Sequence, residues 1–292
     1  MKTIEIPVVF SCQSDDLIGM LHQPENPLSI GVLIVVGGPQ YRVGSHRQFV
    51  LVARMLADNN MPVMRFDYRG MGDSEGSVRS FSDVDDDIKA ALDRFYQHCP
   101  NLSGVVIWGL CDAASAASFY AYQDERIKGL VLLNPWVFTE QGAAKTYLKH
   151  YYLQRLCNPD MWRKVFSFQF DYRESFSSLF LLLRNMLAPN VKHDKLSESE
   201  AIALVDSSLS LPVRVRECLQ RFDHPILFIL SGRDMTADEF RDVIKLDEAW
   251  VQLMESSHVS QFEMSEADHT FSSQKWRDEV SLLTLEWVSQ LH

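Results

Sequence analysis

Cys111 is the residue whose surroundings point most directly to chemistry. It stands at the centre of the G-L-C-D-A turn of residues 109–113, after the apolar run 105–108 and before the alanine-rich segment 113–117. A short buried strand, a tight turn flanked by small residues and a helix together project the central side chain outward, as in a nucleophile elbow. We therefore predict that Cys111 is a nucleophile, in a position where serine is usual.

Two later segments supply partners for this cysteine. Asp234 follows the apolar run 225–230, and His269 follows a predicted strand at 259–264. Because functional loops gather at the carboxyl edge of parallel strands, we expect the three side chains to converge there. In the predicted triad Cys111 attacks, His269 is first general base and then general acid, and Asp234 orients the imidazole.

Other residues compete for these roles. His258 is an alternative to His269, but it precedes the last predicted strand instead of following it. Asp238 and Asp268 are alternatives to Asp234; Asp268 adjoins His269 and would usually point away from its ring. A buried, unreactive thiol is the alternative for Cys111. Histidines without comparable context are predicted to lie at the surface: His22, His98, His150, His193, His224 and His292.

An oxyanion hole needs two backbone N–H groups directed at the developing negative charge. The N–H of Asp112, directly after the nucleophile, is one predicted donor. The other is expected from the G-G-P-Q loop of residues 37–40, which follows the apolar run 32–36. Since the proline of this loop has no N–H, Gly38 or Gln40 must serve.

The side chain of Asp112 complicates this site. A carboxylate beside the nucleophile disfavours a thiolate, so we expect a thiol that is activated as substrate binds. The carboxylate either turns toward Arg47 or Arg69, or caps the helix that follows by accepting backbone N–H bonds. Capping is the favoured interpretation.

Strand-like and helix-like segments alternate along most of the chain, which is typical of a mostly parallel sheet with helices on both faces. An antiparallel hairpin is expected first, and further strands and helices follow at 32–36, 46–59, 62–66, 83–98, 105–108, 113–117, 130–133, 225–230, 236–256, 259–264 and 274–291. Residues 136–222 show no convincing strand but several aromatic-rich helical patches. We predict an α/β core of residues 1–135 and 223–292 with a helical cap inserted at 136–222; ordinary core helices are the alternative for that segment.

The loop D-Y-R-G-M-G-D-S of residues 67–74 has a predicted structural role. Its glycines permit a sharp turn, and Asp67 and Arg69 can join loops through charge-assisted hydrogen bonds. A phosphate-binding loop is a weaker alternative, because no lysine follows and the glycine spacing fits neither a P-loop nor a dinucleotide fingerprint.

Composition limits the function classes. The 292 residues are 46% hydrophobic and 23% charged, as in globular proteins, and the net charge of −11 argues against nucleic-acid or anionic-membrane partners. No apolar run is long enough to span a bilayer. Five scattered cysteines without a C-x-x-C pair indicate neither a zinc site nor a disulfide framework. A cytoplasmic protein without metal or cofactor is expected.

Four segments together resemble one family. They are G-G-P-Q-Y-R at 37–42, D-Y-R-G at 67–70, G-L-C-D-A-A-S at 109–115 and A-D-H-T-F at 267–271. The chain is similar to exosortase A system-associated hydrolase 1, a bacterial family associated with exopolysaccharide and protein-sorting gene clusters. The resemblance implies an α/β-hydrolase fold with a Cys-His-Asp triad and brings no established substrate. Val36 departs from many relatives, which carry histidine before the first glycine.

The predicted activity is hydrolysis of an ester or thioester through an acyl-cysteine. The aromatic, apolar cap favours an acyl or other hydrophobic substrate group, and amides are less favoured. Dienelactone hydrolases also use cysteine on this scaffold, though without a large cap. Acyl transfer to an alcohol by the same triad and a non-catalytic binding protein of the same fold are the alternatives.

Overall fold

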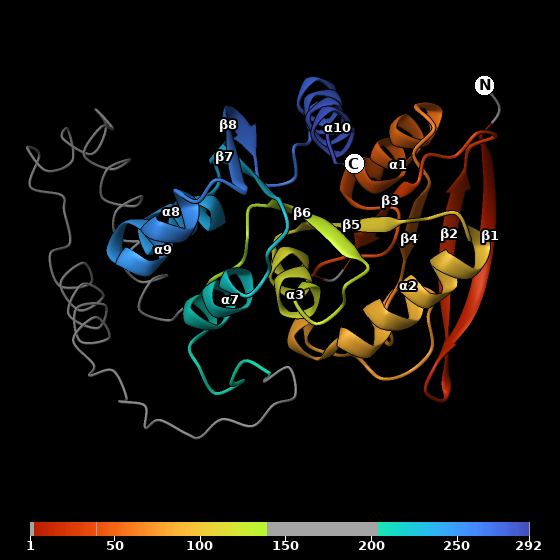
Figure 1. Ribbon diagram of the computed structural model, residues 1–292, viewed down its shortest axis with the longest axis horizontal. Helices are drawn as coiled ribbons and strands as arrows, with labels where there is room; N and C mark the ends of the chain where they lie inside the picture. Colours follow the sequence, from red (N-terminus) through yellow and green to blue (C-terminus); the bar gives the residue numbers. More distant parts are fainter. Residues whose placement is uncertain (1–2, 39, 139–203, 292) are drawn as a thin grey trace, which may run out of the picture. The chain divides into compact units, whose positions relative to one another are not determined.

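The apolar runs form one eight-stranded sheet in the computed structural model, which describes residues 3–38, 40–138 and 204–291. The strand order is β1-β2-β4-β3-β5-β6-β7-β8 (Figure 1). β1 and β2 form the antiparallel hairpin, β2 is also antiparallel to β4, and all other pairings are parallel. The predicted α/β fold with a mostly parallel sheet is confirmed. The strands are β1 Ile4–Cys12, β2 Asp15–Gln23, β3 Ile30–Val35, β4 Val63–Phe66, β5 Gly104–Leu110, β6 Ile127–Leu133, β7 Ile226–Arg233 and β8 Val259–Asp268.

Helices cover both faces of the sheet (Figure 1). Side chains of β3 alternate between two buried cores: Val32 and Ile34 enter one, Leu33 and Val35 the other. This alternation is what a strand covered on both faces requires. The first core is completed by α1 Gln48–Asp58 and α10 Gln274–Val288. The second is completed by α2 Asp85–His98, α3 Asp112–Ala121, α7 Leu211–Gln220, α8 Met235–Leu246 and α9 Glu248–Met254, and short 3₁₀ turns occur at Ser45–Arg47 and Phe81–Asp83.

The prediction of one helix over 236–256 is wrong, because the chain forms α8 and α9 there. Asp247, between them, has the extended backbone angles φ −123° and ψ 113°. Its side chain accepts the N–H of Ala249 at 2.9 Å and so caps α9. Aspartate competes for backbone N–H groups in this way, and a helix pattern read from apolar spacing alone misses such a break.

Part of the predicted cap falls among the described residues. Helix α7 lies inside the range 136–222, and its Val215, Cys218 and Leu219 are buried in the same core as α3. Residues 139–203 lie outside the described part of the chain, so the helical cap remains a prediction. Apart from Phe138 and Leu204, the described residues belong to one compact unit, made of Met1–Val137 and Val205–His292.

The loop after β4 has the structural role expected of it. Asp67 accepts the backbone N–H of Arg42 at 2.6 Å and that of Asp73 at 3.1 Å. Arg69 is buried and bonds to both oxygens of Asp87 in α2, at 3.0 and 2.8 Å. These charge-assisted bonds join the loop after β4 to the loop after β3 and to α2.

The prediction that His22 lies at the surface is wrong, since its side chain is 0% exposed. β2 is paired with strands on both sides, and α1 packs against it, so His22 lies on a covered face of the sheet. The Nε2 atom of His22 accepts a hydrogen bond from Nε of Arg65 at 2.9 Å. Burial first, and then the positive charge of Arg65, lowers the pKa of His22 from 6.5 to about 4.

We expect His22 to make the protein less stable in mild acid. The unfolded chain binds a proton at this residue near pH 6.5 and the folded chain only near pH 4. The free energy of unfolding therefore has its full value, as far as His22 is concerned, above pH 6.5. It falls by about 3 kcal/mol as the pH drops to 4. Urea unfolding at several pH values measures how the free energy of unfolding depends on pH. This dependence should be shallower in His22→Gln than in wild type, and the same as in wild type in the control His98→Gln. An equal slope in wild type and His22→Gln would contradict this account.

Candidate active site

Cys111 occupies a strained turn between β5 and α3. Its backbone angles are φ 64° and ψ −124°, a region that residues other than glycine rarely adopt. The surrounding bonds hold it there: its N–H donates to the carbonyl of Leu133 at 2.8 Å, and its carbonyl accepts the N–H of Ala114 at 3.0 Å. A Cβ atom at Gly109 would lie 2.7 Å from backbone atoms of Ala113. Only glycine therefore lets the strand pass so close to the helix, which produces the predicted elbow.

His269 and Asp234 lie together at the carboxyl ends of β8 and β7. Nδ1 of His269 is 2.8 Å from Oδ2 of Asp234. The hydrogen bond to Asp234, followed by one to the side chain of Cys111, raises the pKa of His269 from 6.5 to about 10, although burial acts in the opposite direction. The structure thus brings the three residues of the predicted triad together. The imidazole thus lies between Asp234 and Cys111, both of which raise its pKa.

The position of Asp234 is fixed by the helix that it begins. Its Oδ1 accepts the N–H of Thr236 and its Oδ2 that of Ala237, each at 3.1 Å. The side chain is only 6% exposed. The first N–H groups of α8 therefore satisfy and orient the carboxylate that faces His269.

The competing residues have other partners. Oδ1 of Asp268 accepts the backbone N–H of Ser272 at 2.9 Å, which closes the turn after His269. Asp238 accepts from Arg241 at 2.9 Å, one turn into α8. His258 lies directly before β8, at the end of that strand opposite to His269. None of these three is placed beside Cys111 by a hydrogen bond among the described residues.

Asn134 is a positioning residue that the sequence did not reveal. It follows β6 with a φ of 43° and is fully buried. Its Nδ2 donates to Oγ of Ser231 at 2.8 Å and to the carbonyl of His269 at 3.1 Å, and its Oδ1 accepts the N–H of Ser231 at 2.8 Å. Oγ of Ser231 in turn donates to the carbonyl of Asp268 at 2.8 Å. This network ties the end of β6 to the loop that carries His269; the only signal in the sequence is an N-P pair after an apolar run.

Of the predicted oxyanion-hole donors, Gly38 is already engaged. Its N–H donates to Oδ2 of Asp112 at 2.8 Å. Gln40, the alternative donor, uses its side-chain Oε1 to accept the N–H of Ser45 at 3.1 Å. The expectation that Asp112 turns toward Arg69 is wrong, because Arg69 is held by Asp87. Nor is helix capping the only role of Asp112, since its carboxylate bonds across to the loop after β3.

Burial separates Cys111 from the other described cysteines. Cys12, Cys99 and Cys218 are buried, whereas Cys111 is partly exposed. Burial raises the pKa of the first two thiols to about 11 and that of Cys218 to about 12. Cys157 lies outside the described residues. A water-soluble thiol reagent is therefore expected to reach Cys111 ahead of these three.

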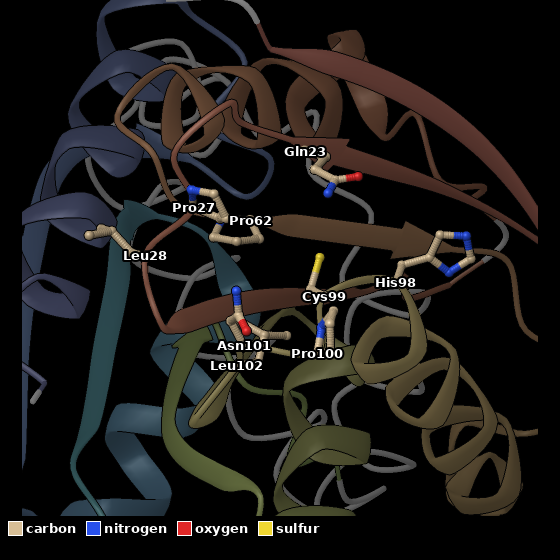
Figure 2. A pocket seen from close by; sticks show the side chains of 9 residues that line it. All are labelled: Gln23, Pro27, Leu28, Pro62, His98, Cys99, Pro100, Asn101 and Leu102. Carbon is tan, nitrogen blue, oxygen red and sulfur yellow. The ribbon is translucent and has the colours of Figure 1, made fainter.

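A small cavity of about 60 Å³ brings a second cysteine and histidine near each other, but away from the triad. Figure 2 shows its lining, which includes Cys99 and His98. Pro62 and Leu102 also line it, and because they precede β4 and β5 the cavity lies at the amino ends of these strands. Nδ1 of His98 is bound to the carbonyl of Arg94 at 3.2 Å. We therefore assign this pair to packing at the end of α2.

The described residues contain neither a metal-binding cluster nor a membrane-spanning helix. No three side chains of histidine, cysteine, aspartate or glutamate gather there in a way that could hold a metal ion. Within the same part of the chain, every helix is too short or too polar to cross a bilayer.

Comparison with known proteins identifies the fold and the family. The structure of a Pyrococcus furiosus esterase superposes on this chain over 99% of this chain and 93% of the esterase chain, at 15% identity and a TM-score of 0.63. An Anabaena variabilis dienelactone hydrolase covers 100% and 99%, at 15% identity and a TM-score of 0.60. Est1E of Butyrivibrio proteoclasticus, with ferulic acid bound, covers 97% and 98%, at 14% identity and a TM-score of 0.60.

These three likenesses show the α/β-hydrolase fold. No curated protein sequence matches the chain. The model of the family described as serine aminopeptidase, S33 (Hydrolase_4) matches residues 31–270. That match runs from β3 to the loop that carries His269 and includes the elbow at residue 111. The chain therefore belongs to this family of the α/β-hydrolase superfamily.

Proposed function

We propose that this protein hydrolyses an ester or thioester through an acyl intermediate on Cys111. The observation that carries the proposal is the partly exposed Cys111 on a strained turn, together with His269, whose pKa Cys111 helps to raise and whose Nδ1 lies 2.8 Å from Asp234. A nucleophile, a histidine and an orienting carboxylate in this relation are the requirements of acyl transfer to an enzyme.

Acylation begins at the sulfur of Cys111. As a thiolate, with the His269 imidazolium as its counter-ion, it attacks the carbonyl carbon and forms a tetrahedral oxyanion. Collapse of this species breaks the bond to the leaving oxygen or sulfur, and His269 donates a proton to that atom. The raised pKa of His269, about 10, keeps this proton available at neutral pH.

Deacylation uses the same groups in reverse. The now neutral His269 takes a proton from water, and the resulting hydroxide attacks the acyl carbon. The second tetrahedral species releases the carboxylic acid and restores the thiolate beside a protonated imidazole. The carboxylate of Asp234 orients and stabilises the imidazolium, as the carboxylate of a Ser-His-Asp triad does.

Mass spectrometry of the intact chain tests this proposal. After brief exposure to 4-nitrophenyl acetate, we expect one acetyl group, and peptide mapping should place it on Cys111. Pretreatment with iodoacetamide should block the label. Label on another residue, or none on Cys111 at any time, would contradict an acyl-cysteine mechanism. An amino-acid 4-nitroanilide in parallel would reveal amide hydrolysis instead.

The biological setting is proposed on the sequence resemblance. The segments at 37–42 and 109–115 support a place beside bacterial exopolysaccharide and protein-sorting functions. A reducing cytoplasm suits the proposal, because a catalytic thiol stays reduced there. The small acyl or ester substrate belongs to the same proposal.

A further inference from the structure

The N–H of Gly38 has one acceptor at rest and would need another during catalysis. It donates to Oδ2 of Asp112 at 2.8 Å. The same N–H is expected to stabilise the oxyanion that forms when Cys111 is acylated. A single N–H makes one strong hydrogen bond, so the carboxylate and the oxyanion compete for it.

The contact is enforced by close packing. A Cβ atom at Gly37 would lie 2.2 Å from Oδ1 of Asp112 and 2.8 Å from the carbonyl oxygen of Leu110. The glycine loop therefore lies directly on the elbow, with the carboxyl group between them. Oδ1 is enclosed and has no hydrogen-bond partner among the described residues. A buried oxygen without a hydrogen-bond partner costs free energy. The resting position of this carboxylate is therefore less stable, and a substrate can displace it more easily.

The groups that surround the carboxylate of Asp112 are the ones that would surround an oxyanion at Cys111. Burial raises the pKa of its carboxyl, while the backbone N–H groups of Gly38, Ala113 and Asp112 itself, and the charge of His269, lower it. The other titratable neighbours are Cys111, which directly precedes Asp112, and Tyr68. Burial and the charge of Asp112 raise the pKa of Tyr68 to about 12. The N–H of Gly38, one of the donors assigned to the oxyanion hole, is thus hydrogen-bonded to this carboxylate at rest.

We propose that the Asp112 carboxylate is a built-in competitor for the oxyanion hole, which a substrate carbonyl must displace from the N–H of Gly38 before Cys111 is acylated. This inference rests on the acyl-cysteine mechanism proposed above. Asp112 then sets the rate of acylation without taking part in the bonds that form and break. The competition affects acylation of Cys111 but not its alkylation, because attack on a saturated carbon forms no oxyanion.

The experiment compares these two reactions in wild type, Asp112→Ala and Asp112→Asn. The acylation rate is taken from the burst of 4-nitrophenolate with 4-nitrophenyl acetate, and the alkylation rate from iodoacetamide. Both rates are read on their pH plateaus, so that a change in thiolate content cancels. We expect the ratio of acylation to alkylation to rise about 10- to 100-fold in Asp112→Ala, the range that corresponds to losing one charge-assisted hydrogen bond. Asp112→Asn keeps an acceptor oxygen without the charge, and its ratio should rise less.

Glu266→Gln is the matched control. It removes one carboxylate that is 65% exposed, from the strand that precedes His269, and its ratio should equal that of wild type. An unchanged or lower ratio in Asp112→Ala, with acyl-Cys111 still formed, overturns this inference and leaves the proposed function standing. Failure to form acyl-Cys111 in wild type and Asp112→Ala alike overturns both. Acylation seen in Asp112→Ala but not in wild type supports the competition at the N–H of Gly38 and contradicts the proposed function of the wild-type chain.

Discussion

Replacing Cys111 with alanine is expected to lower kcat/KM for 4-nitrophenyl acetate by about 10⁴-fold or more. The loss is large because the nucleophile, base and carboxylate act as a unit, and removal of the nucleophile leaves only binding and oxyanion stabilisation. The fold should be unaffected, since the hydrogen bonds that hold the turn are made by backbone atoms of Leu133, Ala114 and residue 111 itself.

Two further variants keep this result interpretable. Cys99→Ala removes a buried thiol at the other end of the sheet and should retain wild-type kcat/KM. Cys111→Ser keeps a nucleophile that is harder to ionise, and its kcat/KM should lie between those of wild type and Cys111→Ala. Thermal melts establish that all three are folded. A folded Cys111→Ala that keeps more than a tenth of wild-type activity would exclude Cys111 as the nucleophile.

The alternation of strands and helical patterns was sufficient to predict the sheet, because the central parallel strands β3, β5 and β6 are almost wholly apolar, as strands buried on both faces are. The elbow could also be predicted, since small residues at 109 and 113 around a cysteine, between a strand and a helix, are what such a turn requires. The break at Asp247 could not, because an aspartate tolerated on a helix surface and one that caps a new helix look alike in sequence. His22 was misplaced for a related reason: which helix packs on β2 is decided by the topology of the fold.

The residues of the site that escaped prediction depend on contacts between distant segments. Asp112 and Gly38 are 74 positions apart, and nothing in either segment indicates that the carboxylate crosses to the glycine loop. Asn134 and His269 are 135 positions apart and meet only because β6, β7 and β8 end together. Residue types can suggest donors and nucleophiles, but which acceptor reaches which donor at rest is a property of the packed structure.

Substituting asparagine for Asp234 is expected to lower kcat about 10²- to 10⁴-fold while leaving the fold intact. Asparagine caps helices as well as aspartate, and its one side-chain oxygen can still accept the N–H of Thr236, which Oδ1 of Asp234 accepts in the wild type. What is lost is the negative charge at Nδ1 of His269, which orients the imidazole and stabilises its protonated form. Asp247→Asn is the matched control, because it alters the cap of α9 in the same way and its partners are Ala249 and Arg216 instead of the triad.

The pKa of His269 gives an independent reading of the same change. The hydrogen bond to Asp234 is the largest cause that raises this pKa to about 10, so its loss must move the value down toward 6.5. NMR titration of the imidazole Cε1–H, assigned by its absence in His269→Gln, measures the shift directly. The pKa should fall in Asp234→Asn and stay unchanged in Asp247→Asn. Because the proton on His269 is what the leaving group receives, the loss of kcat should be greater for alkyl esters than for 4-nitrophenyl esters. A pKa that does not move in Asp234→Asn would show that Asp234 does not set the charge of the triad.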